Sequence, residues 1–513
     1  MKFKNEAFTD FAVPENAARL ARALQDARRD FGQGYPAVIN GRRHHTRKSI
    51  RSLNPSLSKE VVGTATDSNL SLADQALESA TRAFQRWRGV PVEERAALLR
   101  RMAARLRTQK AELTAWIIYE VGKNWAEADA DVAEAIDFLE YYAELAVRPP
   151  PALTPVAHEH NRYRYLPLGP VVVIPPWNFP LAILAGMSAA ALVTGNTVVL
   201  KPSSQSPVIG ARFFEAARAC GVPEGVMNFL PGSGSAIGDY LVKDRRTRMV
   251  AFTGSLSVGL RINALAAKPQ KGQRWIKRVI AELGGKNAIV VDESADIERA
   301  AAEVAASAFG YQGQKCSACS RVFVHKRIYE AFEDRILAQI RALRIGPSAV
   351  RENTMGPVIS KAAQLGIQRH IALGEKHGRL LHGGRAILDR DGFYLEPTLI
   401  GRLPNSSPLW VEEIFGPVLA IAPVGSLEEG IRRANETAYG LTGAVYTRDP
   451  KRLQLAAETF FCGNLYLNRK CTGALVGGHP FGGFNLSGTD SKAGGPEYLL
   501  QFSQPQAISG RRE

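Results

Sequence analysis

Three short segments of this 513-residue chain carry side chains that are able to do chemistry together. Cys316 lies in Gly-Gln-Lys-Cys-Ser at 313–317, Glu282 begins Glu-Leu-Gly-Gly-Lys, and Asn178 lies in Pro-Trp-Asn-Phe-Pro at 176–180. A thiol can attack a carbonyl carbon, a carboxylate can activate water to release an acyl group, and an amide can hold negative charge on oxygen. The set predicts oxidation of an aldehyde through a thioester.

Each of these residues also has a purely structural interpretation. A lone cysteine is usually a small buried hydrophobe, a glutamate before two glycines can simply precede a turn, and asparagines in turns often satisfy local backbone groups. Cys316, however, lies between a lysine and a serine in a glycine-punctuated loop. Such a loop is a poor place for a core residue, which favours the nucleophile interpretation.

The five cysteines are odd in number and widely spaced, which argues against a disulfide framework and for a reducing compartment. They are Cys220, Cys316, Cys319, Cys462 and Cys471. Cys316 and Cys319 form a C-x-x-C pair, but no second pair supplies further zinc ligands, so we expect no metal. A reversible Cys316–Cys319 disulfide that silences the thiol remains a hypothesis.

Composition indicates a soluble globular protein. The chain is 45% hydrophobic and 22% charged, and its net charge of +16 comes from 65 basic and 49 acidic residues. Basic residues are scattered through predicted helices such as 95–110, which Glu93, Glu94 and Glu112 flank, so we expect neither a nucleic-acid nor a membrane partner. No apolar run approaches the ~20 residues that span a bilayer, and no signal-peptide core begins the chain. A cytoplasmic location is the expectation.

Short apolar runs alternate with helical patterns through most of the chain. This alternation predicts an α/β fold in which parallel sheets are covered on both faces. One predicted lobe contains strands at 171–174, 197–200, 227–230 and 249–252, and a second contains strands at 288–291, 321–324, 418–421 and 443–446.

Three further elements have clear local signals. Apolar spacing predicts one core-facing helix over 92–121 with Gly122 as its C-terminal cap. A second helix is predicted over 208–220, closed by Gly221. After the prolines at 149–151, the alternation at 159–166 predicts a strand.

The segment 252–259, Phe-Thr-Gly-Ser-Leu-Ser-Val-Gly, follows a predicted strand and opens a helix. Ser255 and its neighbouring N–H groups are therefore expected to bind a pyrophosphate. A strand-to-helix turn without any ligand would show the same sequence pattern. The nearest match to G-x-G-x-x-G is weak, because Gly232 and Gly234 are followed by a displaced Gly238.

From about residue 35 to the C-terminus, these segments resemble the aldehyde dehydrogenase superfamily. Within it the chain is similar to the bacterial branch that oxidises L-glutamate γ-semialdehyde to L-glutamate, the second oxidation of proline degradation. The motifs that carry the narrower likeness are 252–255, 313–318, 464–468, 479–484, 487–496 and the N-terminal segments 8–11 and 14–16.

The resemblance implies three structural units. These are a Rossmann-like NAD-binding domain (1–150 and 168–282), an α/β catalytic domain (283–485) and a small β oligomerisation domain (151–167 and 486–513). It also implies a homodimer that can assemble into hexamers. Because the dehydrogenase pattern fills the chain, any coupling would be to a separate proline dehydrogenase.

The resemblance assigns Asn178 and the Cys316 N–H to the oxyanion and Glu282 to the hydrolytic water. Lys201 would contact the adenosine ribose of NAD. Many relatives carry a glutamate where Ser204 stands, so the charge that repels a 2′-phosphate is missing and we expect NADP to be tolerated. The full set of expected cofactor residues is Ile174, Pro176, Trp177, Lys201, Ser204, Gly234, Phe252, Thr253, Gly254, Ser255, Val258, Leu283, Glu413 and Phe415.

The expected substrate is a small-molecule aldehyde with an α-amino acid end. The resemblance assigns its carboxylate to the N–H groups of Gly494 and Gly495 with help from Ser317, because glycines expose backbone donors. Its aliphatic chain would lie between Phe179 and Phe502. For its ammonium group we nominate Glu134, in the acidic helix predicted around 130–142.

Three alternatives stay open. Another semialdehyde, such as succinate semialdehyde, would need the same catalytic residues without a site for an amine. A noncatalytic binding protein on the same fold is disfavoured because all three catalytic side chains are present. A cysteine hydrolase would need a histidine partner, and none of the nine histidines lies in a recognisable catalytic motif.

Overall fold

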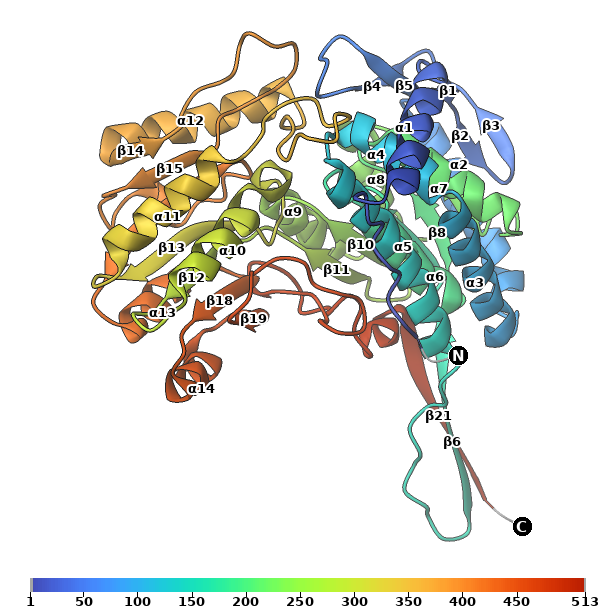
Figure 1. Cartoon of the computed structure of the whole chain (residues 1–513). Helices are drawn as coiled ribbons and strands as arrows, with labels where there is room; N and C mark the ends of the chain where they lie inside the picture. Colours follow the sequence, from blue (N-terminus) through green and yellow to red (C-terminus); the bar gives the residue numbers. More distant parts are fainter. Residues whose placement is uncertain (1–2, 512–513) are drawn as a thin grey trace.

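The alternating strands and helices fold into two separate seven-stranded sheets, one in each lobe of the molecule (Figure 1). This computed structural model describes residues 3–511. All eight strands predicted for the two lobes are present, and the predicted α/β class is confirmed.

The first sheet has the order β11-β10-β7-β8-β9-β2-β3. Neighbours from β11 to β9 run parallel, while β2 and β3 are antiparallel additions at one edge. Val171 and Val173 face one hydrophobic cluster and Val172 faces another, so both faces of the sheet are covered. The strands are β2 (Ala37–Ile39), β3 (Arg42–His44), β7 (Pro170–Ile174), β8 (Thr197–Leu200), β9 (Met227–Phe229), β10 (Met249–Thr253) and β11 (Arg278–Glu282).

Helices cover both faces of this first sheet (Figure 1). The helices of this lobe are α1 (Pro14–Arg29), α2 (Leu70–Trp87), α3 (Val92–Thr108), α4 (Lys110–Val121), α5 (Trp125–Ala146), α6 (Ala182–Val193), α7 (Pro207–Ala219), α8 (Asp239–Lys243) and α9 (Leu256–Ala266). A small sheet packs nearby with the order β1-β5-β4, namely β1 (Gly34–Tyr35), β5 (Val61–Thr66) and β4 (Ser49–Leu53).

The prediction of a single helix over 92–121 is wrong. The segment forms α3 and α4, which meet at Gln109 with φ −95° and ψ 11°. Leu106 and Leu113 are buried on either side of the break and lie seven residues apart, so their spacing stays helical even though the axis changes direction. Gly122 caps α4 as predicted, with φ 72° and its N–H on the Ile118 carbonyl.

The second sheet has the order β14-β15-β16-β13-β12-β18-β19, and only β14 is antiparallel. Its strands are β12 (Asn287–Val291), β13 (Cys319–His325), β14 (Arg379–His382), β15 (Thr398–Gly401), β16 (Val418–Val424), β18 (Thr442–Tyr446) and β19 (Asn464–Leu467). The helices of this lobe are α10 (Ile297–Phe309), α11 (Tyr329–Arg341), α12 (Lys361–His377), α13 (Leu427–Asn435) and α14 (Pro450–Thr459).

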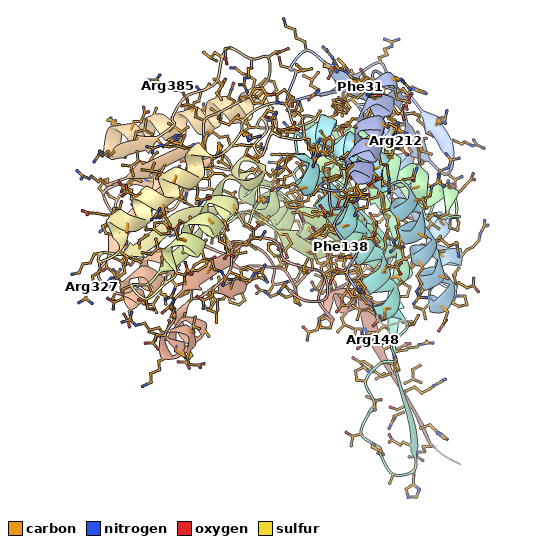
Figure 2. The ribbon with its side chains drawn as sticks, viewed as in Figure 1. Phe31, Phe138, Arg148, Arg212, Arg327 and Arg385 are labelled. Carbon is orange, nitrogen blue, oxygen red and sulfur yellow. The ribbon has the colours of Figure 1, made fainter. Side chains whose placement is uncertain are left out.

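A two-stranded arm extends from the first lobe (Figure 1). It pairs β6 (Glu159–Pro167) with β21 (Ser503–Arg511) in antiparallel register along their whole length, which confirms the strand predicted at 159–166. The chain enters the arm just after Arg148, at the end of α5 (Figure 2). A second short pair joins β17 (Tyr439–Gly440) to β20 (Phe484–Asn485).

Residues 3–511 contain neither a membrane-spanning helix nor a cluster of metal-binding side chains. No helix there is both long enough and apolar enough to cross a bilayer. No group of three or more His, Cys, Asp or Glu side chains is arranged to hold a metal ion.

Candidate active site

A cavity of about 920 Å³ lies at the carboxyl ends of the strands of the first sheet and reaches Cys316 of the second lobe. Ligands of open α/β sheets bind at this edge. Every residue predicted to contact the cofactor lines this cavity, together with Asn178 and Cys316. The cofactor set is Ile174, Pro176, Trp177, Lys201, Ser204, Gly234, Phe252, Thr253, Gly254, Ser255, Val258, Leu283, Glu413 and Phe415.

The loop that carries Cys316 runs from the end of α10 to the start of β13 and is tightly fixed. Tyr311, Gln312 and Gly313 all have positive φ, and a Cβ on Gly313 would lie 2.2 Å from the Gly416 carbonyl oxygen. Only glycine fits at that turn. Asn287 then holds the loop from below, because its Nδ2 donates to the Cys316 carbonyl at 2.7 Å and to the Ala318 carbonyl at 2.9 Å.

The environment of Cys316 disfavours its thiolate. Burial raises the pKa of the thiol well above its usual range, and the nearby carboxylates of Glu413 and Glu282 raise it further. A hydrogen bond from the Ser317 N–H acts in the opposite direction. The thiol therefore needs a proton acceptor before it can attack a carbonyl.

Asn178 is buried in the loop between β7 and α6 and is positioned by the cysteine loop itself. Its Nδ2 donates to the Gln314 carbonyl at 3.0 Å, two residues before Cys316. One amide hydrogen is used in this bond. The second remains for an oxygen in the cavity that Asn178 and Cys316 both line.

Glu282 ends β11 and is paired in register with Thr253 at the end of β10. It does not line the 920 Å³ cavity, because its carboxylate faces the segment 482–491 instead. Ser491 donates its hydroxyl to Oε1, while Oε2 is buried and has no partner within residues 3–511. Burial raises the pKa of Glu282 to about 8, and Oε2 is the atom available to a water molecule.

The cofactor side of the cavity combines a lysine, a helix N-terminus and two residues of the second lobe. Burial lowers the pKa of Lys201 to about 8, and its Nζ is 3.4 Å from the Pro202 carbonyl. Ser255 is the N-cap of α9; its side chain makes no capping bond to the helix backbone, and its hydroxyl lies 3.5 Å from the Ser257 hydroxyl. Phe415 lies edge-on to Trp177, with ring centroids 5.6 Å apart. The donor set and the size of the cavity fit a dinucleotide.

Glu413 is fixed before any ligand binds. Its Oε1 accepts the Gly285 N–H at 2.8 Å, and burial raises its pKa to about 7. A Cβ on Gly284 would collide with the same carboxylate at 2.3 Å. The glycine pair after Glu282 thus lets the Glu413 carboxylate approach the backbone. This is a role beyond the simple turn that the sequence alone allowed.

The predicted carboxylate anchor at Gly494 and Gly495 requires a correction. The Gly494 N–H donates to the Tyr142 hydroxyl at 2.8 Å, and the Gly495 N–H donates to the Lys492 carbonyl at 2.9 Å. Both donors are therefore already used inside the protein. Sequence reasoning detected glycines with backbone freedom, but it did not show which way their N–H groups point.

Phe502 also differs from its predicted role. The side chain is fully buried in the main hydrophobic cluster, where its ring packs on Tyr498 at 5.3 Å. Tyr498 in turn stacks on Tyr142 at 5.4 Å. Phe502, Tyr498 and Tyr142 thus form a row of packed rings in the core. The Phe502 ring contributes to this packing and is not exposed to a substrate.

The other predicted substrate residues lie near the cysteine loop. Ser317 is buried directly beside Cys316. Phe179 follows Asn178, and the Lys123 ammonium lies 3.8 Å from its ring centroid. Burial raises the pKa of Glu134 to about 8, and Glu134 contributes to the raised pKa of Cys316.

Sequence reasoning missed the segment 471–477, which begins beside Ser317. The Cys471 thiol donates to the Ser317 carbonyl at 3.5 Å. Arg469 then holds the next two carbonyls, with its Nη2 3.2 Å from the oxygen of Thr472 and 3.1 Å from that of Gly473. A run of small residues with a positive-φ glycine was the available signal.

The peptide planes of this segment determine where its donors point. In a trans peptide the carbonyl and the N–H of the next residue point in opposite directions. Because Arg469 takes the carbonyls of Thr472 and Gly473, the N–H groups of Gly473 and Ala474 point away from Arg469. Neither donates to another group in the described part of the chain.

The structure does not favour the hypothetical Cys316–Cys319 disulfide. All five cysteines are free. Cys316 lines the cavity, whereas Cys319 is buried in the same hydrophobic cluster as Cys471 and donates to the Arg321 carbonyl at 3.3 Å.

The cysteine on its tight loop, with Asn178 beside it in a cavity large enough for a dinucleotide, is an arrangement suited to the oxidation of an aldehyde. The chain belongs to the aldehyde dehydrogenase family, whose sequence profile matches residues 42–508. It is 48% identical over 509 residues to 1-pyrroline-5-carboxylate dehydrogenase of Geobacillus thermodenitrificans, with 99% of each chain covered.

Two solved structures are also similar. The crystal structure of 1-pyrroline-5-carboxylate dehydrogenase from Thermus with bound NAD superposes with a TM-score of 0.98 and 45% identity, covering 100% of this chain and 99% of that one. Proline utilization A from Bdellovibrio bacteriovorus has a TM-score of 0.98 and 42% identity, covering 99% of this chain but 53% of the longer one.

Proposed function

We propose that this protein oxidises L-glutamate γ-semialdehyde, the open form of 1-pyrroline-5-carboxylate, to L-glutamate with NAD. The observation that carries the proposal is the meeting of Cys316 and Asn178 at one end of the dinucleotide-sized cavity. The relatives named 1-pyrroline-5-carboxylate dehydrogenase, one of them with bound NAD, support this substrate and cofactor.

The residues act in a fixed order. Cys316 gives up its thiol proton to solvent in the cavity, its thiolate adds to the aldehyde carbon, and the new oxyanion accepts hydrogen bonds from Asn178 Nδ2 and the Cys316 N–H. Each such donor is worth about 3 kcal/mol of barrier. NAD, when bound, accepts the hydride that leaves as the carbonyl re-forms. Glu282 then takes a proton from water, which attacks the Cys316 thioester and releases the acid.

The cofactor is held by groups that line the cavity. Lys201 would donate to the adenosine ribose, the N–H groups at the start of α9 would bind the pyrophosphate, and Glu413 would accept from the nicotinamide ribose. Because Ser204 stands where many relatives have a glutamate, the adenosine ribose would have no carboxylate partner at this position. We therefore also propose that NADP is tolerated, and a turnover with NADP more than about a thousandfold below that with NAD would contradict this.

For the substrate carboxylate we propose a revised anchor, formed by the N–H groups of Gly473 and Ala474 with the Ser317 hydroxyl. It is supported by the unused donors, by the orientation that Arg469 gives them and by the link from Cys471 to Ser317. Successive N–H groups of this kind form a concave site for an anion.

For the ammonium group we propose Glu134, which is close enough to influence the Cys316 thiol electrostatically and whose carboxylate a cationic partner would keep ionised. Phe179 would flank the aliphatic chain. Such a site would prefer glutamate γ-semialdehyde to succinate semialdehyde. Succinate semialdehyde has no ammonium group, so its binding would leave the buried Glu134 carboxylate without a cationic partner.

The direct test is the initial rate of NADH formation with glutamate γ-semialdehyde, succinate semialdehyde and propanal. We expect strong preference for the first, abolished in Cys316→Ala. Equal or better turnover of succinate semialdehyde would keep the mechanism and overturn the substrate.

The anchor has its own test in Arg469→Met. This change frees the carbonyls of Thr472 and Gly473 and should raise the KM for glutamate γ-semialdehyde about tenfold while leaving that for propanal unchanged. Arg448→Met is a matched control, because Arg448 is exposed and reaches only Asp296, at 3.7 Å. Equal effects on both aldehydes would contradict the anchor.

We further propose that the protein works with a separate proline dehydrogenase and assembles as a homodimer, extending to a hexamer, through the arm. The longer Bdellovibrio protein, of which a chain like this one covers 53%, supports the first idea. Isotope dilution tests it: complete mixing of the intermediate with an added pool would refute channelling. Sedimentation of a chain ending before β21 tests the second.

A further inference from the structure

The N-terminal segment 3–11, here called the strap, lies along α5 and is tied to it at several points (Figure 1). The Phe3 N–H donates to Glu144, and the Thr9 N–H and hydroxyl both donate to Asp129. Phe11 packs edge-on against Trp125 with centroids 5.3 Å apart. These contacts follow one side of the helix, so the strap and α5 form one unit.

Asn5 connects the strap to a second structure as well. Its Nδ2 donates to Asp137 Oδ2 on α5 at 2.8 Å and to the Val476 carbonyl at 3.0 Å. Both partners are acceptors, so only the amide nitrogen of Asn5 can serve them. Asp137 is buried and its other oxygen accepts the Glu6 N–H at 2.6 Å, which fixes the carboxylate that orients Asn5.

The peptide between Val476 and Gly477 is held on both of its sides. Asn5 takes the carbonyl of Val476, and the Gly477 N–H donates to the Gly494 carbonyl at 2.9 Å. A Cβ on Gly477 would lie 3.1 Å from the Phe3 ring and 3.2 Å from the Tyr141 ring. The strap thus covers Gly477, the first of the two glycines that follow Val476.

This peptide ends the segment 471–477, whose middle is the proposed carboxylate anchor. At the other end, Cys471 contacts the Ser317 carbonyl. The Gly494 N–H donates to Tyr142 on α5, and a Cβ on Gly494 would lie 3.5 Å from the Phe138 ring. The anchor segment is therefore fixed at both ends, by the contact of Cys471 with the cysteine loop and by the hydrogen bond from Asn5 of the strap.

We propose that Asn5 is a positioning residue for substrate binding, which fixes the far end of the anchor segment against α5 so that the N–H groups of Gly473 and Ala474 face the substrate carboxylate. The inference rests on the proposed function, because it concerns the carboxylate end of that substrate. Asn5 touches neither the substrate nor the reacting atoms.

The test compares Asn5→Ala with wild type in KM and kcat for glutamate γ-semialdehyde and for propanal. Loss of both donors should raise the KM for the semialdehyde about tenfold, with kcat within about twofold and propanal kinetics unchanged. Asn16→Ala is the matched control, since Asn16 lies in the same N-terminal region and donates only to the Asp10 carbonyl, at 2.9 Å.

Asn5→Asp separates positioning from packing. Aspartate has nearly the same shape but places a carboxylate against Asp137 and the Val476 carbonyl, so the KM effect should exceed that of alanine. If aspartate behaved like wild type, or if both aldehydes lost activity in parallel with the Tm, the strap would be only structural and the proposal would fail. A wild type that does not prefer the semialdehyde would instead refute the proposed function.

Discussion

Replacing Glu282 with glutamine should separate the two halves of the reaction. Glutamine keeps the shape of the side chain and can still accept the Ser491 hydroxyl, but it cannot take a proton from water. We therefore expect one equivalent of NADH to form rapidly, followed by steady turnover about 10² to 10⁴ slower than wild type.

The pKa of Glu282 also predicts how strongly the deacylation rate depends on pH. Because burial raises the pKa of Glu282 to about 8, about a tenth of the carboxyl groups are ionised at pH 7 and about nine tenths at pH 9. The base is the ionised form, so deacylation in wild type should rise about tenfold across this interval. In Glu282→Gln this rise should be absent.

Stopped-flow measurement of the NADH burst and of the following steady rate, at several pH values, checks both points. Glu282→Asp serves as the control, because it keeps the carboxylate and should keep the rise with pH. Loss of the burst in Glu282→Gln would mean that Glu282 deprotonates Cys316 instead. A pH profile unchanged in the glutamine variant would refute the reasoning outright.

Three further changes test other parts of the structure. Asn178→Ala removes one oxyanion donor and should lower kcat/KM for the aldehyde by about 10² to 10³ with the KM for NAD unchanged, as steady-state kinetics would show; a weaker effect would count against that role. Lys201→Met should raise the KM for NAD about tenfold at constant kcat, and unchanged NAD affinity by calorimetry would contradict the ribose contact. Gly463→Ala would place a Cβ 1.9 Å from the Gly482 oxygen and should lower the Tm by several degrees, whereas Gly478→Ala, whose nearest contact is 3.8 Å, should leave it unchanged.

Both lobes could be predicted from periodicity because each strand is short, apolar and followed by a turn residue. The break at Gln109 could not, since the apolar spacing from Leu106 to Leu113 is the same in one helix or in two. Periodicity records which face of a helix is buried and contains no information on the direction of its axis.

The cofactor side was predicted from the resemblance to the family, and the topology of the sheet explains why its residues meet. Its residues lie at the ends of strands, and strands of a parallel sheet bring their ends to one edge whatever the loops between them do. Thr253 and Glu282, for instance, are neighbours in register although 29 positions separate them. The sequence motifs thus located the cavity before its shape was known.

The sequence by itself determined the class of fold, the candidate nucleophile and the residues that line the cavity, because these follow from residue types, motifs and spacings within single elements. Only the tertiary structure decided which backbone donors are free. Gly473 and Gly494 look alike in the sequence, but Arg469 turns the N–H of one outward and Tyr142 engages the other. The role of Asn5 depends on a contact across 471 positions, which no local pattern records.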